Sequence, residues 1–277
     1  MKYSIVVPVF NEEGNVSVLH AEIVTAMNQL PEHLSGGYEI IFIDDGSSDK
    51  TVEILRNLSP VTVIELRKNF GQTAAMDAGI KHAVGDVIIT LDGDGQNPPS
   101  DIVKLLETMK DGGFDIVSGW RKDRHDPFMK RFTSRGANIL RGILVKDEIH
   151  DSGCSLKAYK RECFDGVDLL GEMHRFIPAI LKWSGFRVGE VEVSHRPRTF
   201  GVTKYNWKRV VKGFIDMVAI WFWRKYARRP LHLFGGVGVI AGGLGTLLLI
   251  GLLIARIFFA YSLSTSILPL IAMLLMI

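Results

Sequence analysis

A long segment without charge near the C-terminus restricts the possible folds of this chain most. From Leu231 to Ala255 there is no Lys, Arg, Asp or Glu, and the apolar stretch continues to Phe259. A helix of about 20 apolar residues spans the roughly 30 Å hydrocarbon layer of a membrane, and only internally hydrogen-bonded backbone is tolerated there. The sequence therefore predicts a transmembrane helix over Leu231–Phe259, with Arg256 near its end, where a long side chain can reach the interface.

The segment before this stretch is basic and rich in tryptophan. Asp216 is its only acidic residue. Its basic residues are Arg196, Arg198, Lys204, Lys208, Arg209, Lys212, Arg224, Lys225, Arg228 and Arg229. Residues 205–226 also carry Trp207, Trp221 and Trp223, and Trp beside basic residues is typical of helices at a lipid interface. Because positive charge marks the cytoplasmic side, we expect the preceding chain to lie in the cytoplasm, at the inner cell membrane.

A second apolar run, Ser266–Ile277, is too short to span a membrane. We interpret it as half of a second span in a truncated sequence, with a re-entrant or interfacial piece as the alternative. The N-terminal apolar run is also too short for a secretory signal peptide, and acidic residues follow it at once.

Net charge and cysteine content argue against a nucleic-acid-binding protein and against a disulfide-rich or zinc-binding protein. The net charge of +3 is too small to indicate a nucleic-acid partner, and we expect none. Cys154 and Cys163 form neither a disulfide framework nor a metal knuckle, which favours a reduced, cytosolic setting.

The N-terminal part alternates between apolar runs and helical stretches. The expected strands lie at 3–10, 39–43, 61–69, 86–96 and 114–121; the expected helices end near 30, begin near 47–49, and cover about 73–84 and 100–110. Continuous Val and Ile runs in such an order predict an α/β fold with a mostly parallel sheet covered by helices on both faces. Beyond Arg121 the pattern loosens: 122–145 is basic and then helical, 150–162 is turn-like, and 185–201 ends in a strand and a basic loop.

Paired carboxylates follow two of these strands. Asp44 and Asp45 end the second strand, and Asp92 and Asp94 end the fourth. Ligands of parallel sheets bind beyond the carboxyl ends of the strands, and two carboxylates plus a ligand diphosphate commonly share Mg²⁺ or Mn²⁺.

The pair Asp92 and Asp94 has two alternatives to binding a cation shared with a ligand diphosphate. An EF-hand would need glycine at position 97 and glutamate at position 103, where Asn97 and Val103 stand. Capping of the helix that follows Ser100 remains an alternative to cation binding. Neither G-x-G-x-x-G after the first strand nor G-x-x-x-x-G-K-[ST] occurs, which argues against a dinucleotide-dependent dehydrogenase or a P-loop enzyme.

Several motifs in order resemble a known family. They are Pro8-Val9-Phe10-Asn11-Glu12, Asp44-Asp45-Gly46-Ser47, Asp92-Gly93-Asp94, Arg196-Pro197-Arg198 and Gly201-Val202-Thr203-Lys204-Tyr205. Together they resemble inverting family 2 glycosyltransferases of the GT-A fold, and more narrowly polyprenyl-phosphate glycosyltransferases, the group of dolichol-phosphate mannose synthases and bactoprenol glucosyltransferases. The resemblance implies a cytoplasmic GT-A catalytic domain over 1–204, interface helices over 205–229 and a transmembrane region over 230–277.

The resemblance also implies a donor site. Pro8, Asn11 and Glu12 would line the nucleotide pocket, with Asp44 against the nucleoside and Asp45 beside it. The cation, Mg²⁺ or Mn²⁺, would be held by Asp92, Asp94 and Gln96. Helix capping is the alternative for Asn11, Glu12 and Asp45.

The expected acceptor site is cationic. A lipid phosphate is already anionic near neutral pH, so it needs positioning more than a strong base. The resemblance favours Arg121, Arg131 and the loop with Arg196, Arg198 and Lys204, which could also close over the donor. Ser134 could donate a hydrogen bond to the lipid phosphate. Asp151 is a candidate base or orienting residue, and a turn-forming role is its alternative; His150 and His195 are expected to be structural.

The resulting hypothesis is transfer of a hexose from a nucleotide sugar, UDP-glucose first and GDP-mannose second, to undecaprenyl or dolichyl phosphate at the cytoplasmic membrane face, with inversion. One alternative is a processive polysaccharide synthase, although none of Gln29, Gln72 and Gln96 begins its Q-x-x-R-W motif. The other is a non-catalytic, membrane-tethered protein that binds nucleotide sugars. A homo-oligomer is a further possibility.

Overall fold

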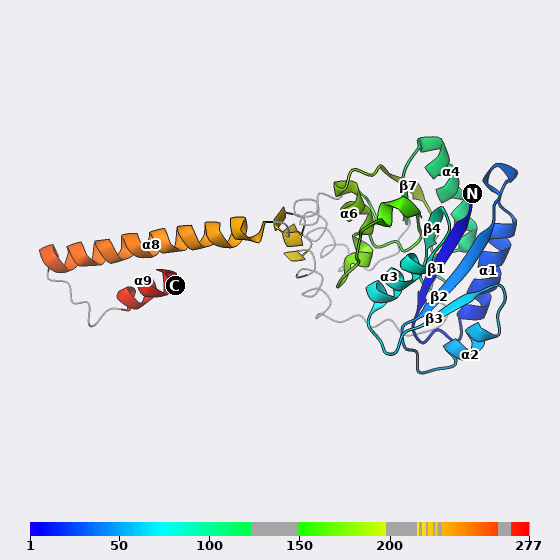
Figure 1. The fold of residues 1–277 in the computed structure, drawn as a ribbon, viewed down its shortest axis with the longest axis horizontal. Coiled ribbons are helices and arrows are strands. Elements are labelled where there is room, and N and C mark those ends of the chain that lie inside the picture. Colours follow the sequence, from blue (N-terminus) through cyan, green and yellow to red (C-terminus); the bar gives the residue numbers. More distant parts are fainter. Residues whose placement is uncertain are drawn as a thin grey trace. The chain divides into compact units, whose positions relative to one another are not determined.

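The computed structural model describes residues 1–122, 149–197, 229–259 and 267–276, together with 215, 218–219, 221–223 and 225–226. The chain divides into two compact units, Met1–Ile220 and Trp221–Ile277 (Figure 1). The boundaries expected at 204 and 229 stay a prediction. Arg131, Ser134, Arg198 and Lys204, and most of the expected interface helix, lie outside the described residues.

The first unit is built on a seven-stranded sheet in the order β3-β2-β1-β4-β6-β5-β7. The strands are β1 (Tyr3–Val9), β2 (Tyr38–Asp44), β3 (Thr62–Glu65), β4 (Val87–Thr90), β5 (Ile116–Trp120), β6 (Lys157–Lys160) and β7 (Val188–Glu192). All neighbours are parallel except β6, which runs antiparallel to β4 and β5. The mostly parallel sheet and its five N-terminal strands are thus confirmed.

Strand β6 corrects the sequence interpretation, which made residues 150–162 turn-like. Its short sequence Lys-Ala-Tyr-Lys places a cation at each end, and Ala158 and Tyr159 are both buried between β4 and β5. The flanking ammonium groups find oxygen partners: Lys157 Nζ donates to the Ser152 carbonyl at 3.2 Å and Lys160 Nζ to Asp115 Oδ1 at 2.7 Å. Tertiary partners therefore permit lysines in an inner strand, and local pattern cannot reveal them.

Helices cover both faces of the sheet. On one face lie α1 (Val16–Asn28), α2 (Thr51–Arg56) and α4 (Ile102–Gly112); on the other lie α3 (Gln72–His82) and α6 (Ile177–Trp183). Short 3₁₀ helices are η1 (Glu32–Leu34), η2 (Pro99–Asp101), η3 (Arg161–Phe164) and η4 (Met173–Arg175). Alternate residues of β1 serve the two cores, since Ile5 packs with α1 and Val6 with α3. Burial on both faces explains the continuous apolar runs. Helix α6 was not expected.

The second unit holds α8 (Pro230–Phe259) and α9 (Leu268–Met276). Within the described residues, α8 is the helix long and apolar enough to cross a membrane. Most of its large apolar side chains are exposed, among them Leu247 and Ile257, each 67%. Such a surface needs an apolar environment around it, so the helix expected over Leu231–Phe259 is confirmed as a candidate span.

Candidate functional site

The carboxyl ends of β1 and β4 border a pocket of about 380 Å³. Five residues expected at the donor site contribute to its wall: Pro8, Glu12, Asp45, Asp92 and Asp94. Because β1 pairs with β2 on one side and β4 on the other, the segments that follow these strands meet at one edge of the sheet. We call this hollow the acidic pocket.

Asn11 joins the segments that follow β1 and β2. Its backbone has φ of 55°, in the left-handed region, and its N–H donates to Ser47 Oγ at 2.8 Å. Its Oδ1 accepts the N–H of Ser48 at 2.8 Å, so its side chain crosses to the neighbouring loop rather than capping α1. The Glu12 carboxylate accepts a hydrogen bond from Asn15 Nδ2, at the residue before α1, so Glu12 shapes the start of that helix.

Asp44 is buried, at 3% exposure, where β2 ends. Its Oδ2 accepts the N–H groups of Gly46 at 3.1 Å and Ser47 at 3.0 Å. Its Oδ1 is buried and has no hydrogen-bond partner within the described residues. A buried carboxylate oxygen of this kind calls for a donor from a ligand or solvent.

Asp45 holds the loop before α3. Its Oδ1 accepts the N–H of Phe70 at 2.7 Å and its Oδ2 that of Gly71 at 2.9 Å. The alternative that Asp45 caps the next helix is therefore wrong: α2 receives its acceptor from Asp49, whose Oδ1 binds the N–H of Thr51 at 3.0 Å. Gly71 has φ of +96°, which side-chain-bearing residues rarely adopt.

The carboxylates of Asp92 and Asp94 lie together at the pocket. Burial and the nearby charge of Asp94 raise the pKa of Asp92. Gln72 Nε2 donates to Asp92 Oδ1 at 2.6 Å, and the Asp94 Oδ1 accepts the N–H of Gln96 at 3.1 Å. A cation bound beside the two carboxylates would offset the negative charge that Asp94 places near Asp92.

The donor set fits Mg²⁺ or Mn²⁺, which prefer oxygen ligands. Within the described residues no group of three or more His, Cys, Asp or Glu is arranged to hold a metal. Asp92 and Asp94 are the two carboxylates that would hold such a cation. Gln96 points elsewhere in this structure: its Nε2 donates to the Arg196 carbonyl at 3.3 Å, so its role as a metal ligand stays a prediction.

Arg196 lies against α1 in this structure. Its Nη1 pairs with Glu22 Oε1 at 2.7 Å, and its N–H donates to the Gln96 carbonyl at 2.8 Å. A part in donor binding would require its side chain to leave Glu22.

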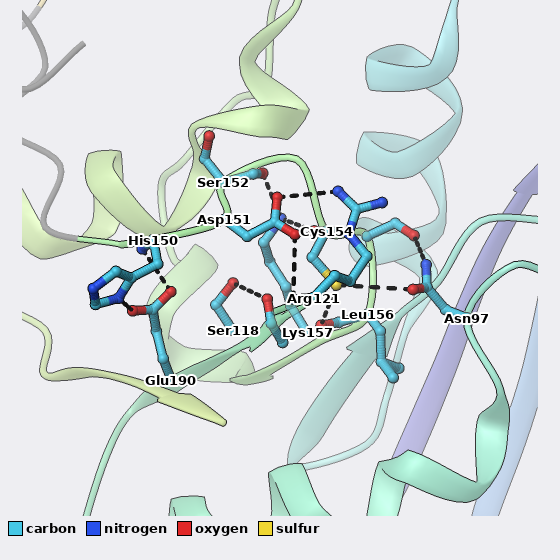
Figure 2. A network of polar contacts seen from close by, with 12 residues as sticks. Asn97, Ser118, Arg121, His150, Asp151, Ser152, Cys154, Leu156, Lys157 and Glu190 are labelled. Carbon is cyan, nitrogen blue, oxygen red and sulfur yellow. Dashed lines mark hydrogen bonds and ion pairs between the residues drawn. The ribbon is translucent and has the colours of Figure 1, made fainter. Parts of the chain in front are cut away.

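A second cluster surrounds Arg121, at the end of β5 (Figure 2). Its Nε donates to Asp151 Oδ2 at 2.7 Å and its Nη2 to Asp151 Oδ1 at 3.0 Å. The two side chains are only 10% and 7% exposed. Burial opposes the charge on Arg121, but the hydrogen bonds and charge of Asp151 outweigh it and raise the pKa of Arg121.

The turn that carries Asp151 is fixed at two further points, also drawn in Figure 2. His150 Nδ1 lies 2.8 Å from Glu190 Oε2, and its ring stacks on Trp120 at 4.6 Å. The ammonium of Lys157 donates to the carbonyls of Ser152 and Cys154, and burial lowers the pKa of Lys157. His150 thus has the structural contacts expected of it.

Ser155 connects this turn to the acidic pocket. Its Oγ accepts the Asp92 N–H at 3.1 Å and the Asn97 Nδ2 group at 2.8 Å. Sequence reasoning did not identify Gln72 or Ser155, because their partners are 20 to 63 residues away. It also missed Lys157, whose partners are nearby backbone carbonyls that the residue types do not indicate. The turn residues around Asp151 offered only a weak local signal.

Comparisons with known proteins agree on one family. The family model described as "Glycosyl transferase family 2" matches residues 4–167. The chain is 40% identical over 258 residues to the dodecaprenyl-phosphate galacturonate synthase of Rhizobium johnstonii, covering 90% of this chain and 75% of that protein. It is 37% identical over 259 residues to the undecaprenyl-phosphate 4-deoxy-4-formamido-L-arabinose transferase of Salmonella choleraesuis, covering 92% and 77%.

Solved structures show the same fold. The glucosyl-3-phosphoglycerate synthase of Mycobacterium tuberculosis, in complex with Mn²⁺ and UDP-glucose, matches with a TM-score of 0.59 at 18% identity. The match covers 80% of this chain and 78% of that one. At this identity the likeness is evidence for the fold alone.

Proposed function

Because the chain belongs to glycosyltransferase family 2 and has the GT-A fold, we propose that it transfers a hexose from a nucleotide sugar to a polyprenyl phosphate, with inversion at the anomeric carbon. The observation that supports this proposal is that the buried Arg121–Asp151 pair lies close enough to the acidic pocket for the charge of Arg121 to lower the pKa of Asp92, against the larger effect of burial. The acidic pocket offers carboxylates to a cation, and the Arg121–Asp151 pair offers a guanidinium to an anion.

The donor would occupy the acidic pocket. The Oδ1 of Asp44, which has no hydrogen-bond partner in the described part of the chain, could accept a hydrogen bond from the nucleobase or ribose. Pro8, Asn11 and Glu12 shape the neighbouring wall and loop. Asp92 and Asp94, with Gln96 as a further candidate, would hold Mg²⁺ or Mn²⁺, which offsets charge on the departing nucleoside diphosphate.

The acceptor phosphate would be positioned by cations. Arg121 is held in one orientation by both Asp151 oxygens, and an oriented guanidinium binds phosphate through paired donors. Since both oxygens of Asp151 are engaged, we assign it an orienting role rather than that of a base. Arg131 and Ser134 are further candidates at the acceptor. The phosphate itself attacks the anomeric carbon from the face opposite the leaving group, which produces inversion.

A basic segment follows Arg196 in the sequence. It carries Arg198 and Lys204 and could close over the diphosphate. Closure would exclude water, the competing nucleophile.

Three nucleotide sugars are candidate donors. We retain UDP-glucose as the first donor to test and GDP-mannose as the second. A uronic acid donor such as UDP-galacturonate joins them, because the relative at 40% identity is named for galacturonate.

We also propose that α8 anchors the chain in the inner membrane, with residues 1–204 on the cytoplasmic face and 205–229 at the lipid interface. The apolar surface of α8 and the basic segment before it support this topology. Cysteine accessibility in inverted membrane vesicles tests it: a cysteine placed at Ser100 should react with an impermeant reagent only when the cytoplasmic face is outside.

The decisive experiment uses the full chain in lipid nanodiscs. It is incubated with undecaprenyl phosphate and each donor, with Mn²⁺, Mg²⁺ or EDTA, and the glycolipid is identified by mass while nucleoside diphosphate release is followed. We expect one sugar per lipid, and loss of turnover in Asp94→Ala at saturating metal. A polymer would favour a processive synthase, and donor binding without released diphosphate would favour a non-catalytic binding protein; either result contradicts the proposal.

A further inference from the structure

Gln72 makes a direct contact with the acidic pair that the proposed function leaves unexplained. It is the first residue of α3, lies in the wall of the acidic pocket, and its Nε2 donates to Asp92 Oδ1 at 2.6 Å. A hydrogen bond this short to a carboxylate fixes the rotation of the carboxylate plane. A side-chain hydrogen bond with Ser155 also acts on the Asp92 carboxylate and opposes the rise in its pKa that burial causes, so two neighbouring side chains hold this group at the pocket wall.

The position of Gln72 is itself fixed. The two residues before it, Phe70 and Gly71, donate their N–H groups to the two oxygens of Asp45, at 2.7 and 2.9 Å. Asp45 is only 4% exposed, and Gly71 supplies the φ of +96° that turns the chain into α3. The path Asp45, loop, Gln72 and Asp92 therefore consists of consecutive contacts from the end of β2 to the segment after β4.

The chemistry of an amide suits this position. Four acidic residues, Glu12, Asp45, Asp92 and Asp94, contribute to the same wall. A lysine in place of Gln72 would neutralise the charge of Asp92 and compete with a cation, whereas a carboxylate in that place would repel the Asp92 carboxylate. An amide donates a hydrogen bond and leaves the negative charge of the pocket intact.

We propose that Gln72 is a positioning residue that sets the Asp92 carboxylate for cation binding, and that Asp45 acts one step earlier by fixing the start of α3. The inference rests on the proposed function, in which Asp92 is a cation ligand. Residues that orient a ligand through a hydrogen bond typically change metal affinity or activity about 10-fold to 100-fold when they are lost.

The test compares Gln72→Met, which keeps the length but removes the donor, with the wild-type full chain. Binding of Mn²⁺ in the presence of UDP is measured from the electron paramagnetic resonance signal of free Mn²⁺, and UDP binding is measured separately in EDTA. Gln29→Met is the matched control, because Gln29 is exposed at the end of α1.

We expect Gln72→Met to weaken Mn²⁺ binding about 10-fold or more, with UDP binding in EDTA unchanged and the thermal midpoint within about 4 °C of the wild type. Raising Mn²⁺ should restore most of kcat. Asp45→Asn, which loses one acceptor, should weaken Mn²⁺ binding in the same direction, and adding Gln72→Met to it should cause little further loss, because the two act along one path.

Two results would overturn the inference: unchanged Mn²⁺ binding in Gln72→Met, or weakened UDP binding in EDTA, which would mean that Gln72 contacts the nucleotide directly. Failure of the proposed function looks different. If the wild type binds no Mn²⁺ in the presence of UDP, Asp92 and Asp94 do not hold the cation, and the role of Gln72 fails with them. If the wild type binds Mn²⁺ and Gln72→Met binds it equally well, the proposed cation site stands and the role of Gln72 alone is refuted.

Discussion

The buried pair of Arg121 and Asp151 allows a prediction with a worked magnitude. Replacing Asp151 by Leu removes one partner and leaves the guanidinium, 10% exposed, without its carboxylate. Loss of one partner of a buried ion pair costs about 3–5 kcal/mol of unfolding free energy. For a unit of this size about 1 kcal/mol lowers Tm by roughly 2–4 °C, so we expect a decrease of about 6–20 °C.

Two comparisons make the measurement specific. The double variant Arg121→Met with Asp151→Leu should recover most of the lost stability, because replacing a buried ion pair by apolar residues is often nearly neutral. The control is the exposed pair of Arg56 and Glu65, at 2.7 Å with side chains 64% and 40% exposed. Glu65→Leu should cost less than about 1 kcal/mol.

The assay is thermal unfolding of the full chain in detergent, followed by tryptophan fluorescence, since Trp120 adjoins the pair in sequence. A decrease below about 2 °C for Asp151→Leu, or a double variant as unstable as the two singles combined, would refute the reasoning. Activity adds a second readout from Asp151→Asn. An orienting residue should mainly raise KM for the lipid phosphate, whereas a base would lower kcat and change its pH profile.

Three further predictions concern stability and reactivity. The ammonium of Lys160 lowers the pKa of Asp115 below 3.8, so this carboxylate stabilises the fold above that pH and the contribution disappears as pH falls through the lower folded value; Asp115→Asn should flatten the decrease of Tm below about pH 4. Burial raises the pKa of Cys163 to about 12, so its thiol should react with a disulfide reagent at pH 8 only after denaturation. A Cβ at Gly46, with φ of +75°, would meet backbone at 2.6 Å, whereas Gly166, at +73°, has open space; Gly46→Ala should therefore lower Tm more than Gly166→Ala.

The sequence predicted the parts of the fold that follow from local periodicity. Five N-terminal strands, the helices between them and the apolar helix α8 occur where apolar runs predicted them. Continuous burial on both faces leaves a clear pattern in Val and Ile. Strand β6 has no such pattern, and its place between β4 and β5 depends on partners such as Asp115 for Lys160.

The same division holds for the site. Local motifs placed Asp45, Asp92 and Asp94 at one edge of the sheet, and the pocket includes all three. The local sequence did not predict the hydrogen-bond partners of each carboxylate. Asp45, for example, accepts hydrogen bonds from the loop before α3 instead of capping α2. Those partners lie 25 and 26 residues away, and only the packing of α3 brings them together.

The sequence by itself determined the strand and helix order, the acidic edge and the membrane-compatible tail, because these depend on residue type at short spacing. Tertiary structure alone decided that Gln72 donates to Asp92, that Asp151 pairs with Arg121, and that Ser155 accepts the N–H of Asp92. These contacts link segments 20 to 63 residues apart. The sheet fixes these contacts, because its register places the carboxyl-terminal ends of β4 and β5 beside the amino-terminal end of the antiparallel strand β6.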